Sequence, residues 1–215
     1  MLGKFIAIEG SDSSGKATQT RSLVERLRSE GYAISTASFP RYGEPVVEEI
    51  KKYLKESPAK DPYEASKIYA KDRLDAAPKI RAKLNSGGIF VADRFTPSNA
   101  AHQGGKITDL AERKKYVEWL YRYEYQELGI PKPDVVVILH VPVELSLRLI
   151  EKRGGARDGH EADPSHLRNA EATYSLLAKW YPEDHKLVEC VKDGELLPPE
   201  VIAEKIYKTI KPLLK

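Results

Sequence analysis

Residues 10–16 read Gly-Ser-Asp-Ser-Ser-Gly-Lys and directly follow the apolar run 5–8. This is the GxxxxGK pattern of a phosphate-binding loop, placed as expected between a first strand and a first helix. Gly10 and Gly15 let the backbone curl so that several N–H groups face one anion, and the dipole of the following helix adds positive potential. Lys16 supplies a full charge for the β- and γ-phosphates. The sequence therefore predicts a nucleoside triphosphate site.

The loop departs from the usual pattern at the position after its lysine. A Ser or Thr there normally ligates Mg²⁺ through its hydroxyl, whereas this chain has Ala17, followed by Thr18. A magnesium ion would depend more on phosphate oxygens, water and carboxylates. The nearest carboxylates are Asp12, inside the loop, and Glu9, at the end of the preceding strand. We expect these two side chains to hold the metal, directly or through water.

Composition narrows the class of protein. The chain has 215 residues, 41% of them hydrophobic and 31% charged, which suits one folded domain over 1–215 and argues against disorder. The net charge of +3 is too small to indicate nucleic-acid binding. The single Cys190 cannot form an internal disulfide, which fits a cytoplasmic protein. No apolar stretch approaches the roughly 20 residues that span a bilayer, so we expect no membrane partner.

Apolar periodicity and turn residues predict strands that alternate with helices. Strands are expected over 5–9, 33–39, 89–93, 134–140 and 186–191, and helices over 16–30, 46–55, 62–85, from about 97, 109–128, 142–153, 165–181 and 199–213. Pro78 is expected to kink the helix over 62–85. The alternation predicts an α/β three-layer sandwich of the P-loop NTPase type, with a five-stranded parallel sheet, helices on both faces and a lid loop over 153–164. Ligands bind at the carboxyl ends of such strands.

Basic side chains lie close to those strand ends. The third strand finishes in Asp-Arg-Phe at 93–95, the second in Phe-Pro-Arg-Tyr at 39–42, and Arg73 lies in the helix between them. Arginine suits bidentate recognition of phosphate. Arg94 and Arg73 are therefore candidates to face the phosphate loop across one crevice.

Together these motifs resemble those of thymidylate kinases. The resemblance rests on the phosphate loop, on Phe-Pro-Arg-Tyr, on Asp-Arg-Phe and on Ser-Asn-Ala-Ala-His-Gln at 98–103, in the same order and spacing. It continues to Tyr174 and so covers nearly the whole chain. It implies a kinase that converts dTMP to dTDP with ATP and Mg²⁺, and an ATP site formed by Gly10, Ser11, Asp12, Ser13, Ser14, Gly15, Lys16, Ala17 and Thr18.

The resemblance also implies how the acceptor is bound. Arg94 would hold the acceptor phosphate and be oriented by Tyr42, while Asp12 would contact the deoxyribose 3′-hydroxyl or a water on Mg²⁺. Arg73 would donate to thymine O4, and Asn99 would accept from thymine N3–H. Cytosine would present a donor to Arg73 and no N3 hydrogen to Asn99, which costs roughly 1–3 kcal/mol for the unmet groups.

Further positions would complete the acceptor site. Tyr69 would stack on the thymine ring, Pro40 would pack on its 5-methyl group, and Tyr174 and Gln103 would lie near the nucleotide. His102 departs from the family pattern, which often has a Tyr there that crowds the ribose 2′ position. Selection against ribonucleotides is therefore an open question for this chain.

The charged segment 153–164 matches the family's lid, which closes over the phosphate donor. Some members carry a catalytic Arg inside the phosphate loop, but Ser13 and Ser14 occupy those positions here. Arg153 and Arg157 would then supply the dispersed positive charge that phosphoryl transfer needs. An exposed loop with no role is the alternative reading.

The helix over 109–128 carries an apolar face of Tyr116, Trp119, Leu120 and Tyr123. Because the resembling enzymes are homodimers through long helices, we expect this face or its neighbour to be a dimer contact. Such stripes also form ordinary core.

Two other functions stay open. One is a different pyrimidine nucleoside monophosphate kinase that accepts dUMP or a ribonucleotide. The other is a non-catalytic nucleotide-binding regulatory protein, for which Ala17 is the only evidence. Retention of Arg94, Asp12 and the arginines of the lid segment speaks against the second.

Overall fold

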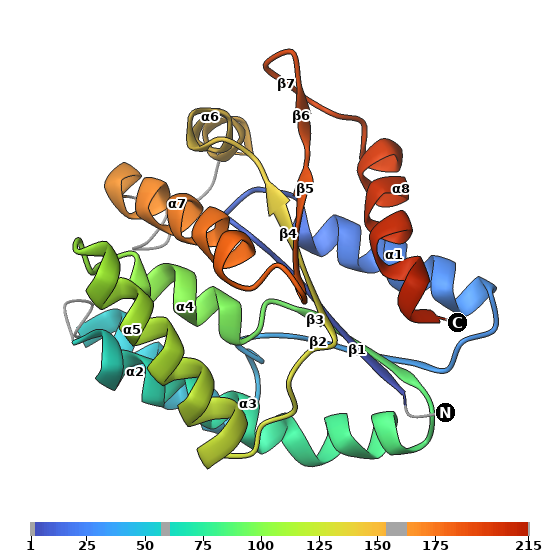
Figure 1. Cartoon of the computed structure of the whole chain (residues 1–215), viewed down its shortest axis with the longest axis horizontal. Helices are drawn as coiled ribbons and strands as arrows, with labels where there is room; N and C mark the ends of the chain where they lie inside the picture. The colour runs from blue at the N-terminus through green and yellow to red at the C-terminus, as the bar shows by residue number, and fades with distance from the viewer. Residues whose placement is uncertain (1–2, 57–60, 154–162, 215) are drawn as a thin grey trace.

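The computed structural model describes residues 3–56, 61–153 and 163–214. Its centre is a five-stranded sheet in the order β2-β3-β1-β4-β5, in which every pairing is parallel (Figure 1). The strands are β1 Lys4–Gly10, β2 Ile34–Ser38, β3 Ile89–Asp93, β4 Val135–His140 and β5 His185–Glu189. The fold class predicted from the sequence is confirmed, with β1 and its phosphate loop at the middle of the sheet.

Helices cover both faces of this sheet. On one side lie α1 Lys16–Ser29 and α8 Pro199–Ile210, and on the other α3 Pro62–Asn85, α4 Thr96–Gly104, α5 Leu110–Tyr121 and α7 Pro164–Trp180 (Figure 1). The remaining helical segments are η1 Pro45–Val47, α2 Glu48–Glu56, the π-helix η2 Arg122–Glu127, α6 Val143–Arg153 and η3 Lys211–Leu214. None of the described helices has the length and apolar character needed to cross a membrane.

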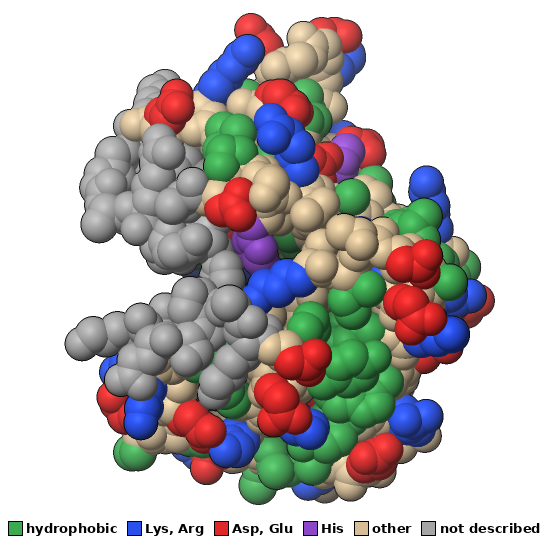
Figure 2. Space-filling model, turned by 90° about the vertical axis from the view of Figure 1, so that its left-hand side faces the viewer, with side chains coloured by type: hydrophobic (Ala, Val, Ile, Leu, Met, Phe, Trp, Pro, Cys, Tyr) green, Lys and Arg blue, Asp and Glu red, His purple; other side chains and the backbone are tan. Residues whose placement is uncertain are grey.

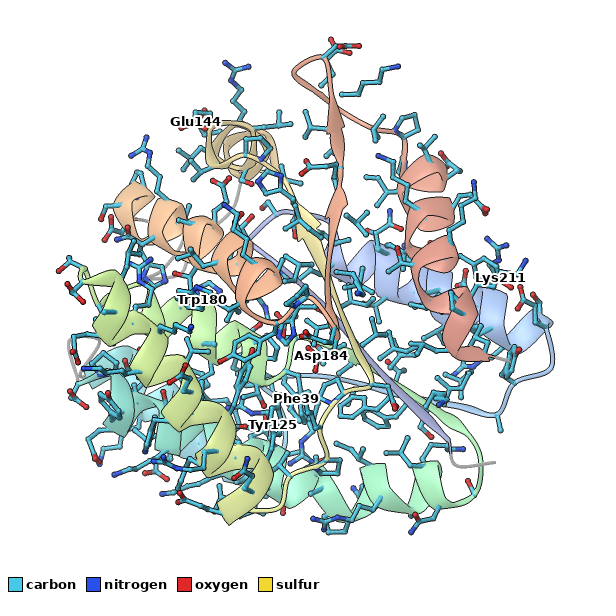
Figure 3. All side chains as sticks on the ribbon, in the orientation of Figure 1. Phe39, Tyr125, Glu144, Trp180, Asp184 and Lys211 are labelled. Carbon is cyan, nitrogen blue, oxygen red and sulfur yellow. The ribbon has the colours of Figure 1, made fainter. Side chains whose placement is uncertain are left out.

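Alternation along β1 explains why two cores form. Phe5 and Ala7 pack into the core under α3, α4, α5 and α7, whereas Ile6 and Ile8 pack into the core under α1 and α8. Successive side chains of a strand point to opposite faces, so a strand that is apolar at every position belongs between two helical layers. Phe39 is part of the first core and Tyr125 packs against that core; both are labelled in Figure 3.

Several predicted boundaries need correction. The fifth strand ends at Glu189 rather than 191, because Asp193 and Gly194 turn the chain at positive φ into a separate hairpin, β6 Val191–Lys192 with β7 Glu195–Leu196. The helix predicted over 109–128 is α-helical only to Tyr121 and continues as η2. The segment 46–55 begins with the short η1 turn before α2. The bounds predicted for the helix over 62–85 are those of α3, which continues past Pro78 to Asn85. The kink expected at Pro78 stays a prediction.

Candidate active site

The phosphate loop begins at Gly10, where the end of β1 is closely packed against β4 and the loop itself. Gly10 has φ 144°, and a Cβ there would lie 2.6 Å from the Leu139 carbonyl oxygen and 2.7 Å from Ser14 Oγ. Gly15 takes φ 87° directly before α1 begins at Lys16. Both positions therefore need glycine, the first for close approach and the second for its left-handed backbone. The two glycines thus shape the loop, and their role in binding an anion stays a prediction.

Hydroxyl groups around this loop are buried without a hydrogen-bond partner among the described residues. They are Ser11 Oγ, Ser13 Oγ, Ser14 Oγ and Thr20 Oγ1. Buried polar groups are normally paired, and an unmet one costs about 1–3 kcal/mol. Donors gathered at the amino end of a helix are suited to an anion. The loop thus has the donor set of a phosphate site.

Lys16 points back along its own loop. Its Nζ donates to the Ser11 carbonyl oxygen at 2.6 Å, and the residue is only 7% exposed. Burial and the nearby charge of Arg94 lower the pKa of Lys16 to about 8, against the opposite pull of Asp12. The ammonium group is therefore still mostly charged at neutral pH, in a site where its charge is poorly hydrated.

Arg94 reaches the loop from the end of β3. Its backbone is left-handed, with φ 65°, and its N–H donates to the Ile8 carbonyl oxygen of β1 at 3.0 Å. Its guanidinium forms an ion pair with Asp12 and contacts His102 Nε2 at 3.3 Å. Burial alone would raise the pKa of Asp12, but the charges of Arg94 and Lys16 outweigh it and hold that pKa well below its usual range.

Glu9 braces the same edge of the sheet from inside. Its carboxylate accepts hydrogen bonds from Phe95 N at 2.7 Å, from Ser98 N at 3.1 Å and Oγ at 2.5 Å, and from the Tyr174 hydroxyl at 2.9 Å. Burial raises its pKa, although these donors oppose the shift. Both carboxylate oxygens are occupied, so Glu9 fixes the loop after β3 and the start of α4 relative to β1.

A second cluster of polar residues lies deeper, between α3, α4 and η2. Arg73 is 3% exposed and pairs with Glu124, whose exposure is 0%. Asn99 is 5% exposed and donates through Nδ2 to the Ser66 carbonyl oxygen at 3.3 Å. Tyr69 lies on α3 nearby and meets the Tyr53 ring edge to face, with 6.0 Å between centroids. These groups offer both a donor and an acceptor to a planar heterocycle.

Comparison with known proteins agrees with this geometry. The sequence model of one family, described as thymidylate kinase, matches residues 8–196. The chain belongs to the thymidylate kinase family. It is 33% identical over 183 residues to thymidylate kinase of Mycobacterium tuberculosis, covering 81% of this chain and 85% of the relative. It is 30% identical to thymidylate kinases of Thermomicrobium roseum, over 98% of this chain and 96% of the relative, and of Homo sapiens, over 98% and 95%.

The thymidylate kinase resemblance inferred from the motifs is thus confirmed. His102, which departs from the family pattern, lies beside Arg94. The His102 ring contacts two side chains: its Nε2 faces Arg94, and its Nδ1 lies 3.1 Å from His166 Nε2 of α7. Because a guanidinium only donates, His102 Nε2 accepts there. The rings of His102 and Tyr174 meet edge to face at 6.3 Å, and Tyr174 is 2% exposed. Sequence reasoning missed His166.

Other predicted residues are less closely tied to this centre. Tyr42 is 63% exposed, while Arg94 forms an ion pair with Asp12 and contacts His102. Pro40 is half-buried, next to Arg41, which anchors its loop to α3 through Asp72 at 2.7 Å. Gln103 is 1% exposed, with its Oε1 unpaired among the described residues. The roles predicted for Tyr42, Pro40 and Gln103 stay predictions.

The lid arginines cannot be placed. Arg157 lies outside the described residues, and of Arg153 only the backbone at the end of α6 is described. The segment does have defined anchors on either side. After it, Asp163 caps α7 by accepting from Ser165 N at 2.8 Å. Before it, the first residue of α6, Val143, donates its N–H to Glu171 of α7 at 3.0 Å.

The carboxylates present fit a metal that arrives with phosphate rather than a resident one. Among residues 3–56, 61–153 and 163–214, no group of three or more Cys, His, Asp or Glu could hold a metal ion. Asp12 uses Oδ1 for Arg94, and its Oδ2 makes no hydrogen bond with the described residues. Both oxygens of Glu9 are occupied, and exposed Ala17 offers no ligand. Asp12 is the better placed of the two predicted ligands.

Proposed function

We propose that this chain phosphorylates dTMP to dTDP, transferring the γ-phosphoryl group of ATP to an oxygen of the acceptor phosphate. One observation carries the proposal: Arg94, which follows β3, forms an ion pair with Asp12, inside the loop to which Lys16 donates a hydrogen bond. Lys16 belongs to the donor site. Arg94 serves an acceptor phosphate, which would compete with Asp12 for the guanidinium. The two phosphates would therefore meet beside Asp12.

Catalysis at this centre needs charge and alignment rather than a base. A phosphate oxygen of dTMP is already a nucleophile, and the transferring phosphoryl group spreads negative charge over its oxygens. Lys16 and Arg94 would stabilise that charge from a site with little water, where their electrostatic effect is large. Arg153 and Arg157 would add to it, as the family resemblance suggests.

Magnesium would be held by Asp12 together with the nucleotide's own phosphate oxygens, with water completing the shell. Bound there, the ion neutralises phosphate charge and helps align donor and acceptor. Glu9 is the weaker candidate because hydrogen bonds already engage its carboxylate. ATP as donor rests on the phosphate loop and on the family.

Base recognition would fall to the polar cluster beneath the crevice. Arg73 Nε and Nη2 are engaged by Glu124, and Nη1 makes no hydrogen bond among the described residues, which leaves it for thymine O4. Asn99 would accept from N3–H, with Tyr69 against the ring and Pro40 near the 5-methyl group. This set favours thymine and uracil over cytosine.

The acceptor is tested by a panel of nucleoside monophosphates at equal concentration, with ATP and Mg²⁺, following ADP release. We expect dTMP to give the highest kcat/KM. Preference for dCMP or AMP would show that the base site is misassigned, and no transfer to any acceptor would favour a binding protein. His102 gives a specific reason to include ribo-TMP, since a ribonucleotide kinase is the second candidate.

We further propose a homodimer and a cytoplasmic location. Tyr116 and Leu120 are fully buried in the core, so they are unavailable to a partner, whereas Trp119 and Tyr123 are half-buried and stack at 5.3 Å. Figure 2 shows hydrophobic side chains gathered in one patch on the face where α5 and η2 lie. Sedimentation of wild type and a Trp119→Glu variant tests the dimer. The lone buried Cys190 suits a reducing compartment.

A further inference from the structure

Glu124 is a fully buried carboxylate on the core-facing stripe of α5 and η2. The buried positions of α5 are Arg113, Tyr116, Val117, Leu120 and Tyr121. The same stripe continues into η2 at Glu124, whose exposure is 0%. An ionised carboxylate is placed this deeply only where partners compensate its lost hydration. Its partners therefore indicate its purpose.

Three hydrogen bonds compensate Glu124. Arg73 of α3 donates through Nε to Oε2 at 2.6 Å and through Nη2 to Oε1 at 2.5 Å. Thr96, the first residue of α4, donates through Oγ1 to Oε2 at 2.8 Å. The Phe95 ring lies 5.9 Å from the Arg73 guanidinium. The guanidinium is thus held in a fork that fixes its plane.

The fork changes what Arg73 can bind. A guanidinium without a counterion, 3% exposed, would attract an anion strongly. Paired with Glu124 the site is close to neutral, and only the remaining N–H groups can serve a ligand. A directed donor in a neutral site suits a ring carbonyl of an uncharged base better than a phosphate. Arg94 and Lys16 keep the anion-binding role.

Thr96 links the Arg73–Glu124 pair to the segment that carries Arg94. It follows Arg94 by two positions, at the point where β3 turns into α4. Glu124 therefore joins α3, where Arg73 would donate a hydrogen bond to the base, to the segment where Arg94 would donate hydrogen bonds to the acceptor phosphate. Its position controls how far apart those two donors are held.

We propose that Glu124 is a positioning residue for acceptor selectivity: by pairing with Arg73 it turns a buried cation into a directed donor for the carbonyl of an uncharged base. The inference rests on the proposed function and deepens it. A purely structural ion pair would also be buried and bidentate, so the test must separate selectivity from stability.

The test is Glu124→Gln, which keeps the shape and removes the charge. We expect the ratio of kcat/KM for dTMP over dCMP to fall about tenfold or more, since selectivity here depends on a directed hydrogen bond. The KM for dTMP rises, and the KM for ATP changes less than about twofold because the phosphate loop is untouched. In an Arg73→Gln background, Glu124→Gln should leave the ratio unchanged.

Asp184→Asn is the matched control. Asp184 pairs with Lys132 at 2.5 Å and with His185 at 2.5 Å, directly before β5, and it is labelled in Figure 3. Its carboxylate makes no hydrogen bond with Arg73, Thr96 or Glu124 among the described residues. Its loss should lower the unfolding midpoint and leave the dTMP to dCMP ratio unchanged. If Glu124→Gln does not fold, Glu124→Asp keeps the charge but shortens the fork, and the ratio should still fall.

The outcomes separate the two proposals. A wild-type protein that prefers dTMP, with a Glu124→Gln variant that loses dTMP and dCMP activity equally, overturns the role of Glu124 and leaves the function standing. An equal change of the ratio in both Arg73 backgrounds also overturns it. A wild-type protein that phosphorylates neither acceptor removes the proposed function and this inference together.

Discussion

Raising the pH through about 9 should weaken the ion pairs that His140, at the end of β4, forms with Glu171 and Glu189. The His140 ring donates through Nδ1 to Glu189 of β5 at 2.8 Å and through Nε2 to Glu171 of α7 at 3.1 Å. Glu171 also accepts from Val143 N at the start of α6. The hydrogen bond to Glu171 raises the pKa of His140 to about 9, burial opposes this, and Glu189 adds to it.

The magnitude follows from linkage. The folded pKa of His140 lies above the unfolded value of about 6.5, so its stabilising contribution is complete below that value and is lost as pH rises through about 9. A shift of that size corresponds to about 3 kcal/mol at most. His140 is 22% exposed but Glu189 is 55% exposed, so water screens part of the attraction. We expect about 1–3 kcal/mol between about pH 6 and about pH 10.

Lys16 contributes with the opposite sign in the same range. Its folded pKa is lowered to about 8, so it destabilises the fold below that value and this penalty disappears as pH rises toward about 10.5. The wild-type curve alone would mix the two effects. The measurement is therefore the difference in free energy of unfolding between wild type and His140→Gln, from denaturant titrations over about pH 6–10. Because Lys16 is present in both proteins, its contribution cancels.

The expected difference is largest near pH 6, about half as large near pH 8, and close to zero near pH 10. A difference that stays constant across this range would show that His140 stabilises only as a neutral hydrogen-bonding group, and the ion-pair reasoning would be refuted. A difference that grows with pH would refute the sign.

Three further results are expected. Lys16→Ala and Arg94→Ala should each reduce phosphoryl transfer by orders of magnitude in a protein that is still folded by circular dichroism; wild-type turnover in either variant would remove that residue from the centre. Asp12→Asn should raise the Mg²⁺ concentration needed for half-maximal rate. An unchanged dependence would point to Glu9 or to a carboxylate of the lid segment, such as Glu161, which lies outside the described residues. His102→Tyr should raise the ratio of kcat/KM for dTMP over ribo-TMP, because a phenol fills more of the space around a 2′-hydroxyl than an imidazole does; an equal or lower ratio would place sugar selection elsewhere.

Local sequence rules were enough for the sheet and the phosphate loop. Gly10, Gly15 and Lys16 follow a pattern whose spacing is set by backbone geometry. The strands of the sheet are apolar runs between turn residues, so their positions along the chain could be predicted without knowing which strands pair. The hairpin after Glu189 was missed although Asp193-Gly194 is a local turn signal. The change from α-helix to π-helix at Arg122 has no comparable signal in the sequence.

The sequence did not predict the buried hydrogen bonds that support the site, because each of them joins residues far apart in the chain. The sequence predicts a metal ligand at Glu9, and nothing local shows that Ser98 and Tyr174 supply hydrogen bonds to its carboxylate. Glu124 did leave a trace, a carboxylate four residues after buried Leu120 on the apolar stripe. His166 left none, because a lone histidine on a helix has many ordinary explanations.

The bonds of Glu9 also constrain how the chain can be made. Its donors are separated from it by 86, 89 and 165 residues, so a nascent chain emerging from the ribosome holds this carboxylate long before it can be buried with partners. Until Tyr174 is synthesised, dehydrating Glu9 leaves part of its hydrogen-bonding capacity unmet. The hydrogen bonds of Glu9 can therefore be completed only late in synthesis, with β5 and α8 still to follow.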